Sequence, residues 1–340
     1  MSSNIVLTNQ KYQNVLASLH SSAFLRSSDA GKTWTVQSRP VALVKAAWGT
    51  PMVGVGIAGA ATGELYQTID GGVSWNETGV TGVALLDICM VGPDHGWACG
   101  ASETIFRTYD GGGSWYECAG VPAFGGKEVQ SICGYRNPIT GALRIYAAGQ
   151  ANGGAASLMT STDGSTFTLR AGGGTGNPDG ISCNRAGPTP GRVVIAQDGV
   201  NALSSVDYGV TWAVKTAVAQ SGYVQNLCLS SMRSKLCLMA TGSTGATPFL
   251  YVSVDDGVSY AADTGWPAIN CIGICETPKG VIYAVGGTAS TGEIVLYVMT
   301  ALFKWSRVGV LSGNGASLFY NIAASEGYVS DGVAAVLDIS

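Results

Sequence analysis

The chain has 340 residues, of which 46% are hydrophobic and 12% are charged, and its formal net charge is −4. This composition excludes a disordered chain, which needs low hydrophobicity and high net charge, and a long helical bundle, which needs a surface rich in Glu and Lys. The 49 glycines follow no Gly-X-Y period, so a collagen-like chain is excluded as well. The remaining class is an all-β protein with many tight turns.

The same numbers limit the possible partners. Because no basic stripe is present to neutralise phosphates, we expect no nucleic-acid partner. The first ten residues have neither a basic segment nor an apolar core, which predicts that they are no signal peptide. No run of 18 apolar residues occurs, so we expect no membrane insertion.

The nine cysteines are odd in number, form no Cys-x-x-Cys motif and mostly occupy apolar runs. This pattern predicts buried free thiols in a protein made in a reducing compartment. Only His20 and His95 are available to assist them and no ligand spacing fits, so we expect no metal and no cofactor. The cysteines are Cys89, Cys99, Cys118, Cys133, Cys183, Cys228, Cys237, Cys271 and Cys275.

One unit of four short strands recurs along the chain, and residues 83–118 show it most clearly. An apolar first strand at 83–91 is followed by an Ala/Gly-rich second strand at 95–100. A third strand leads into a polar turn, and a fourth strand starts with an aromatic residue. No segment carries a sustained helical period. The same order recurs in residues 4–38, 41–79 and 267–309.

The polar turn is an octet with the pattern Ser/Thr-x-Asp-x-Gly-x-Ser/Thr-aromatic. Its aspartates recur at intervals of 41, 40, 53, 44 and 48 residues, which is the period of a four-stranded propeller blade. Full copies are Ser27–Trp34, Thr68–Trp75, Thr108–Trp115, Ser205–Trp212 and Ser253–Tyr260. Ser161–Phe167 is one residue shorter, and a degraded copy keeps only its aromatic residue, Trp305.

The residue types of the octet predict a structural turn. The carboxylate can accept hydrogen bonds from amides of its own turn, and the glycine can take a positive φ. The aromatic side chain can pack between neighbouring sheets. We therefore predict a structural role, without catalysis or metal binding, for Asp29, Gly31, Trp34, Asp70, Gly72, Trp75, Asp110, Gly112, Trp115, Asp163, Phe167, Asp207, Gly209, Trp212, Asp255, Gly257, Tyr260 and Trp305.

These octets resemble the Asp-box (BNR) repeat along nearly the whole chain. His95-Gly-Trp-x-x-Gly, followed by Thr-x-Asp-Gly-Gly-x-Ser-Trp, is similar to repeats of the photosystem II assembly-factor group of propellers. The Asp-box also occurs in sialidases, xyloglucanases and sortilin-type receptors. The resemblance therefore implies a β-propeller, and it says little about function.

The expected fold class is all-β, a single propeller of four-stranded antiparallel blades. Seven units account for residues 1–311, and strands in 312–340 complete or extend the ring. These last strands are expected at 317–324, 327–332 and 334–339. Seven blades is the main prediction, and eight with an incomplete last blade is the alternative. A closed ring removes exposed sheet edges.

Candidate chemistry is weak. A sialidase resemblance would require an Arg-Ile-Pro motif, and the nearest string, Arg144-Ile145-Tyr146, lacks the proline. Gly54-x-Gly56-x-x-Gly59 matches a dinucleotide motif, but no helix follows it. We interpret His20 and His95 as structural and predict that the chain is not an enzyme. Glycoside hydrolysis needs two carboxylates at one cleft, and the acids outside the octets include Asp87, Asp94, Glu103, Asp179 and Asp198.

Three functions remain. The main prediction is a non-catalytic structural propeller of a bacteriophage virion (tail, fibre or capsid-associated) that is folded in the host cytoplasm and binds other virion proteins, with a surface glycan as a further candidate partner. The second is an assembly-factor-like propeller, with a cytoplasmic location as the alternative. The third is a sialidase-like glycosidase or a lectin that stacks sugars on Tyr135, Tyr223 or Trp266.

Overall fold

The computed structural model describes residues 15–338 without 20–22, 28–34, 39–42, 51, 59–61, 138–139, 153–154, 173–175, 185–190, 198–201, 216–222, 231–232, 234, 243–249, 277–279, 288–292, 314–318 and 326–332. The regular elements of these residues are all β-strands. No helix of the described part is long and apolar enough to cross a membrane.

The described strands form seven sheets, six of four strands and one of five. The first two four-stranded sheets contain β4 (Leu43–Trp48), β5 (Gly54–Ala58), β6 (Glu64–Thr68) and β7 (Asn76–Val80), then β8 (Leu85–Val91), β9 (His95–Gly100), β10 (Ile105–Thr108) and β11 (Tyr116–Glu117). The next two contain β12 (Val129–Arg136), β13 (Leu143–Asn152), β14 (Ala155–Ser161) and β15 (Thr168–Arg170), then β16 (Pro178–Cys183), β17 (Val193–Gln197), β18 (Ala202–Ser205) and β19 (Ala213–Val214).

The last two four-stranded sheets contain β20 (Tyr223–Leu229), β21 (Cys237–Gly242), β22 (Leu250–Ser253) and β23 (Ala261–Ala262), then β24 (Asn270–Glu276), β25 (Ile282–Gly287), β26 (Glu293–Ala301) and β27 (Lys304–Gly313). The five-stranded sheet has the order β28 (Phe319–Ser325), β29 (Val333–Asp338), β1 (Val15–Leu19), β2 (Ala23–Ser27) and β3 (Thr35–Ser38).

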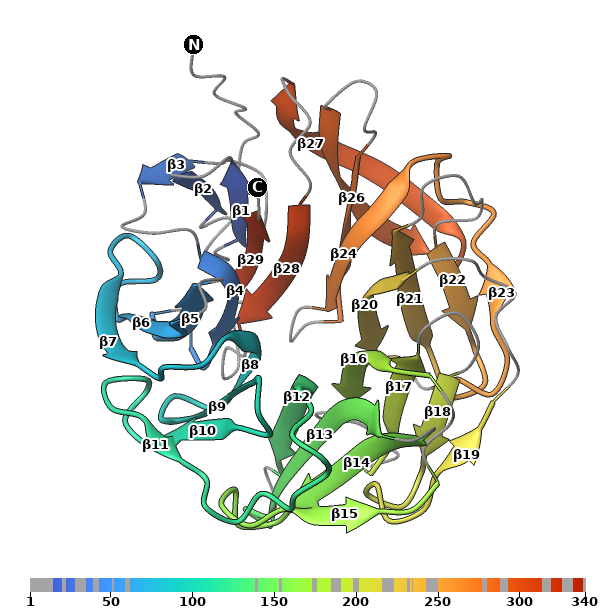
Figure 1. Cartoon of the computed structure of the whole chain (residues 1–340). Coiled ribbons are helices and arrows are strands. Elements are labelled where there is room, and N and C mark those ends of the chain that lie inside the picture. The colour runs from blue at the N-terminus through green and yellow to red at the C-terminus, as the bar shows by residue number, and fades with distance from the viewer. Residues whose placement is uncertain are drawn as a thin grey trace.

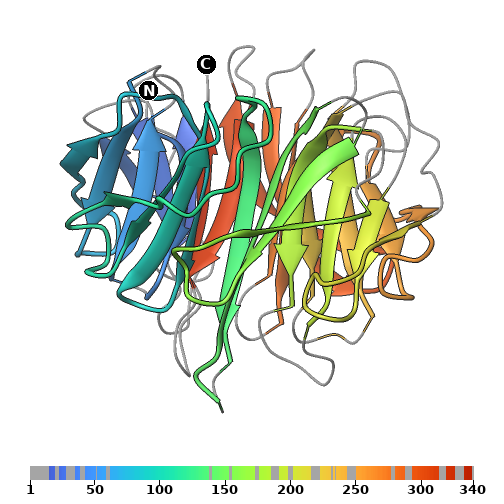
Figure 2. The ribbon, with the colours of Figure 1, turned by 60° about the horizontal axis from the view of Figure 1, so that its bottom comes forward.

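The sheets stand around one axis as a propeller (Figure 1). The first strand of each four-stranded sheet lies innermost, where β4, β8, β12, β16, β20 and β24 contact one another around the ring and β28 completes the circle. The strands run between two faces of the ring, and the turns lie at those faces (Figure 2). The predicted all-β propeller class is therefore confirmed.

The inner strands of the β8–β11 sheet are buried and the outermost strand is exposed. Most of β8 is buried, β9 is buried except for His95, and the two residues of β11 are exposed. An outermost strand of only two residues leaves few unpaired backbone groups, which protects the sheet edge from pairing with another chain.

The C-terminal strands complete the sheet that the N-terminal strands begin. β28 and β29 pair antiparallel, and β29 then pairs parallel with β1, through Val15 with Ala334 and Leu16 with Ala335. The described C-terminal strands therefore belong to this shared sheet, and the strand order gives no separate eighth sheet in the described residues. The middle segment of the predicted tail, residues 327–332, lies outside the described residues.

Candidate functional site

Each described octet is a turn that is closed by its own aspartate. In the octet after β6, Asp70 Oδ1 accepts hydrogen bonds from the Thr68 hydroxyl at 2.8 Å and from the Ser74 N–H at 2.9 Å. Asp70 Oδ2 accepts from the Ser74 hydroxyl at 2.6 Å, and the Thr68 oxygen accepts from the Gly72 N–H at 2.8 Å. The side chains of this octet thus satisfy the polar groups of the turn locally.

The same arrangement recurs in the other described octets. Asp110, Asp207 and Asp255 each accept from the preceding Ser/Thr hydroxyl and from the N–H and hydroxyl of the residue four positions later. In the shortened octet, Asp163 Oδ1 accepts from the N–H groups of Ser165 and Thr166, both at 2.8 Å. Asp29, Gly31 and Trp34 of the first octet lie outside the described residues.

These hydrogen bonds keep the octet carboxylates ionised. Burial raises the pKa of Asp255, but the hydrogen bonds from Ser259 and Ser253 outweigh it and lower the pKa to about 2. The N–H groups of Thr166 and Ser165 lower the pKa of Asp163 to about 2. The pKa values of Asp70, Asp110 and Asp207 are lowered by hydrogen bonds of the same kind, again against the effect of burial.

Two successive residues of the full octets that the structure describes have a positive φ, of which the sequence pattern predicted only the second. Gly72 and Gly112, at the fifth position, have φ of 84° and 96°. At the fourth position two octets have glycine, but the others have Tyr208 at 64° and Asp256 at 69°. Side chains other than glycine carry a steric cost in this left-handed region, so these two residues need a compensating contact.

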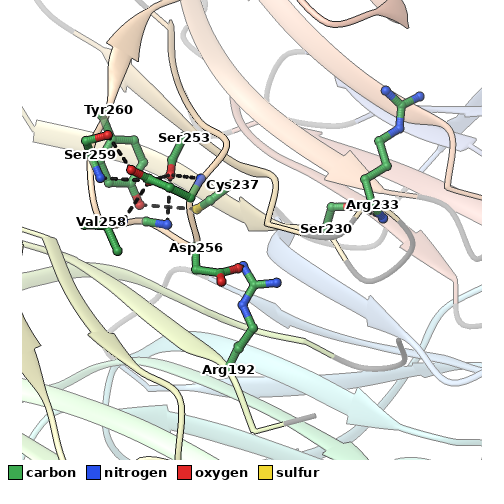
Figure 3. A network of polar contacts seen from close by, with 11 residues as sticks. Arg192, Ser230, Arg233, Cys237, Ser253, Asp256, Val258, Ser259 and Tyr260 are labelled. Carbon is green, nitrogen blue, oxygen red and sulfur yellow. Dashed lines mark hydrogen bonds and ion pairs between the residues drawn. The ribbon is translucent and has the colours of Figure 1, made fainter. Parts of the chain in front are cut away.

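That contact comes in both cases from an arginine of the preceding sheet. The Arg192 guanidinium forms an ion pair with the Asp256 carboxylate (Figure 3). Arg192 is only 3% exposed, and a charge buried to this extent needs such a partner. Similarly, the Arg144 guanidinium carbon lies 5.3 Å from the centre of the Tyr208 ring, a cation–π distance.

The octet aromatics join neighbouring sheets. Trp115 packs against a buried cluster that contains residues of both the β4–β7 and the β8–β11 sheets. Phe167, Trp212, Tyr260 and Trp305 belong to clusters that are likewise shared between their own sheet and the one before it. Trp75 is buried and meets Trp48 of its own sheet edge-on, with 5.7 Å between ring centres. Trp75 and Phe167 thus lie in the core of the ring, and the other described octet aromatics are partly buried and pack against that core.

Polar contacts also join the innermost strands around the axis. Asp87 on β8 accepts from the Lys45 ammonium on β4 at 3.0 Å, and from the Ser131 hydroxyl and the Ile132 N–H on β12 at 2.7 and 2.8 Å. The Ser131 oxygen accepts from the Ile181 N–H on β16 at 3.2 Å. One carboxylate outside the octets therefore connects three successive sheets.

The same chain of contacts continues through the next inner strands. The Ser182 oxygen on β16 accepts from the Leu229 N–H on β20 at 2.9 Å, and the Ser230 hydroxyl donates to Glu276 on β24.

The other candidate acids outside the octets do not come together where the structure describes them. Asp94 and Glu103 lie beyond opposite ends of β9, and Glu103 accepts from the N–H groups of Phe124 and Gly126. Asp179 is on β16, two sheets away around the ring from Asp87, and Asp198 lies outside the described residues. The described residues also contain no group of three His, Cys, Asp or Glu residues that could hold a metal ion.

The remaining candidate histidines and aromatics lie mostly against other rings. His95 is half-buried, stacks on Trp97 at 6.4 Å and meets Tyr109 edge-on at 5.1 Å. Burial and Arg136 lower the pKa of His95, while Asp94 opposes this shift. Tyr135 and Trp266 are buried, so they offer no ring face for stacking a sugar. His20 and the side chain of Tyr223 lie outside the described residues.

The cysteines and the glycines of the dinucleotide-like string serve packing. All nine cysteines are buried and free, so the prediction of buried free thiols is confirmed. On β5, a Cβ at Gly54 would approach the Trp48 ring to 2.5 Å, and one at Gly56 would meet Leu43 and Trp75 at 3.2 Å. Gly59 lies outside the described residues.

Solved structures of other proteins share this fold. No family model and no curated protein sequence matches the chain. Among solved structures, YCF48 bound to D1 peptide is similar at 15% identity and a TM-score of 0.58, over 99% of this chain and 96% of that one. YCF48 from Cyanidioschyzon merolae is similar at 13% identity and 0.55, over 84% and 96%. A protein from Lactobacillus plantarum reaches 10% and 0.63, over 96% and 98%.

Proposed function

We propose that the chain is a non-catalytic β-propeller that binds a segment of another protein, in the manner of an assembly factor. The observation that carries this proposal is the likeness, along 99% of the chain, to YCF48 with a bound D1 peptide. The resemblance of its octets to the photosystem II assembly-factor repeats points in the same direction. The prediction of a virion component and that of a glycan ligand have no support from the solved structures.

The described carboxylates hold turns and strands together, which supports the non-catalytic part of this proposal. The described octet aspartates accept hydrogen bonds inside their own turns, and Asp87 holds three inner strands together. Glycoside hydrolysis needs two carboxylates that face one substrate, and these side chains are already committed to the fold.

Cross-linking in the source organism followed by reconstitution tests the proposal. The tagged full chain is cross-linked in cells, its cross-linked partner is identified by mass spectrometry, and binding of the two purified proteins is measured by calorimetry. We expect saturable binding to a protein, and no hydrolysis of a fluorogenic sialoside or a β-glucan. Turnover in proportion to the protein concentration would contradict the proposal, and recovery of the chain from purified virions would restore the virion alternative.

A further inference from the structure

The exposed apolar side chains gather on one face of the ring. We call the face that carries the octet turns and the turns between first and second strands the octet face. Of the 13 large hydrophobic side chains that are exposed among the described residues, nine lie in these turns and four on the outermost strands. The nine are Met52, Ile69, Val73, Tyr109, Val206, Val210, Val254, Val258 and Leu302.

These side chains are held in place by the turns that carry them. Val206 and Val210 flank Asp207, and Val254 and Val258 flank Asp255, whose hydrogen bonds fix each turn. The turns are also tied to their own sheets, since the Asp256 N–H donates to the Lys235 carbonyl at 3.1 Å. The exposed valines therefore present apolar surface that is already ordered, which lowers the entropy cost of covering it with a partner.

The charges of the octet face differ between two sectors. In the turns of the β4–β7 and β8–β11 sheets the charged residues are the carboxylates Asp70, Asp94 and Asp110, and Arg107 near the end of β10 adds a cation that lies over the Tyr109 ring. In the next three sheets the octet aspartates are accompanied by arginines and a lysine, which lie in or beside the turn between the first and second strands. These cations are Arg136, Arg144, Arg233 and Lys235, in addition to the Arg192 that is paired with Asp256.

We propose that the octet face binds the octet face of a second copy of this chain, around a two-fold axis. Such a contact uses the same surface twice, so the surface must complement itself. An anionic sector and a cation-bearing sector on one face meet this condition, because a two-fold rotation can lay each sector over the other. A uniformly acidic partner would instead be repelled by the anionic sector, and a uniformly basic one would leave Arg233 and Lys235 without an opposite charge. The exposed apolar side chains of the octet face are covered in both copies by the same contact.

Equilibrium sedimentation of the full chain tests the proposal. We expect a dimer in the micromolar range, and a dissociation constant raised at least tenfold when Val206, Val210, Val254 and Val258 are all changed to serine. The control changes Val80 and Val214 on the outermost strands to serine. Val214 of the control and Val254 of the octet face are both 55% exposed. These two positions are therefore matched in residue type and exposure, and they differ in their place on the ring.

Cross-linking gives a second readout that does not depend on weakening the dimer. Because all nine native cysteines are buried, Val254→Cys and Val214→Cys each add one accessible thiol. In a dimer that lays one sector over the other, Val254 of one copy faces the anionic sector of the second copy, which includes Val73. A short bismaleimide should therefore link a mixture of Val73→Cys and Val254→Cys chains into covalent dimers, and should leave a mixture of Val73→Cys and Val214→Cys chains unlinked.

Three results would overturn the proposal: a wild-type chain that is monomeric at 100 µM, equal weakening of the dimer by the octet-face and control variants, or equal cross-linking in the two mixtures of cysteine variants. A monomer that binds phosphatidylglycerol vesicles through the same valines would also refute it, and would assign the octet face to a membrane surface. Because partner binding by calorimetry is measured separately, failure of the dimer leaves the proposed function standing.

Discussion

The octet aspartate is the residue on which the most polar groups of each turn depend. Asp110 accepts from the Thr108 hydroxyl and from both the N–H and the hydroxyl of Ser114. A side chain that accepts several bonds inside its own turn stabilises that turn, and its loss leaves these donors to find water or remain unpaired.

Replacing this carboxylate should destabilise the protein without a change of fold. We expect Asp110→Ala to lower the free energy of unfolding by about 1–2 kcal/mol, measured by chemical denaturation. Asp94→Ala is the control, because Asp94 is an exposed acid of the same sheet and lies outside the octet. An equal effect of the two changes would mean that charge, and not the turn, is responsible.

Stability should also depend on pH through these groups. Because the pKa values of Asp163 and Asp255 are lowered to about 2, their stabilisation is complete above the unfolded-state pKa near 4 and is lost as the pH falls toward 2. Denaturation curves at pH 6, 4 and 2.5 should show a decline concentrated in the last interval. Asp163→Asn should reduce that decline, and an unchanged pH profile in this variant would contradict the assignment.

Replacing Asp256 by glycine has two effects on stability with opposite signs: it relieves a left-handed side chain, and it removes an ion pair. Asp256→Gly relieves a left-handed side chain, by about 1–2 kcal/mol, but leaves the buried Arg192 without its partner. Because breaking a buried pair costs about 3–5 kcal/mol, we expect net destabilisation in thermal or chemical denaturation. Adding Arg192→Met should recover most of the loss, whereas stabilisation by Asp256→Gly alone would show that the ion pair contributes little.

Among the elements, the innermost strands are coupled most directly. Asp87 links β4, β8 and β12, and it does so from a strand that is otherwise apolar and buried. A carboxylate in such surroundings holds its place through the donors that surround it, so its removal should affect three sheets together.

We expect Asp87→Ala to lower the free energy of unfolding by about 1–3 kcal/mol, because the Ser131 hydroxyl and the Ile132 N–H lose their acceptor. Hydrogen exchange should increase in β4, β8 and β12, and should stay unchanged in β24. Faster exchange confined to β8 would argue against coupling between the sheets.

The turns and the strand period could be predicted from the sequence, and the contacts between residues far apart in the chain could not. The octet turn could be predicted because its donors and acceptors lie within eight residues, and the four-strand period follows from the spacing of the octets. Nothing local marks the contact of Asp87 with Ser131, which are 44 residues apart, or the pairing of Arg192 with Asp256. The octet pattern likewise allowed any residue at its fourth position, so it hid the positive φ of Tyr208 and Asp256.

At the scale of the whole molecule, one sheet is shared by the two ends of the chain. β29 lies between β28 and β1, and it pairs parallel with β1 through Val15 with Ala334 and Leu16 with Ala335. At this pair the C-terminal strands join the N-terminal strands of the sheet.

A proline in this junction should open the ring. In Ala335→Pro, β29 loses a backbone donor inside a central strand, where proline is essentially not found. We expect a lower melting temperature, and proteolysis that starts in the five-stranded sheet. Val80→Pro, at the end of the outermost strand β7, is the control and should be tolerated better. A variant that melts like the wild type would show that β29 is dispensable.

The junction of β1 with β29 also sets an order of events during synthesis. β1 to β3 leave the ribosome before the other described strands, and their partner β29 follows all of these, so their edge stays uncovered while the other sheets form. Contacts between residues so far apart raise the contact order and slow folding, because the entropy cost of closing the intervening chain comes before the pairing can stabilise it. Until then the open edge can accept the β29 of another molecule, so fast translation at high concentration favours strand exchange over closure.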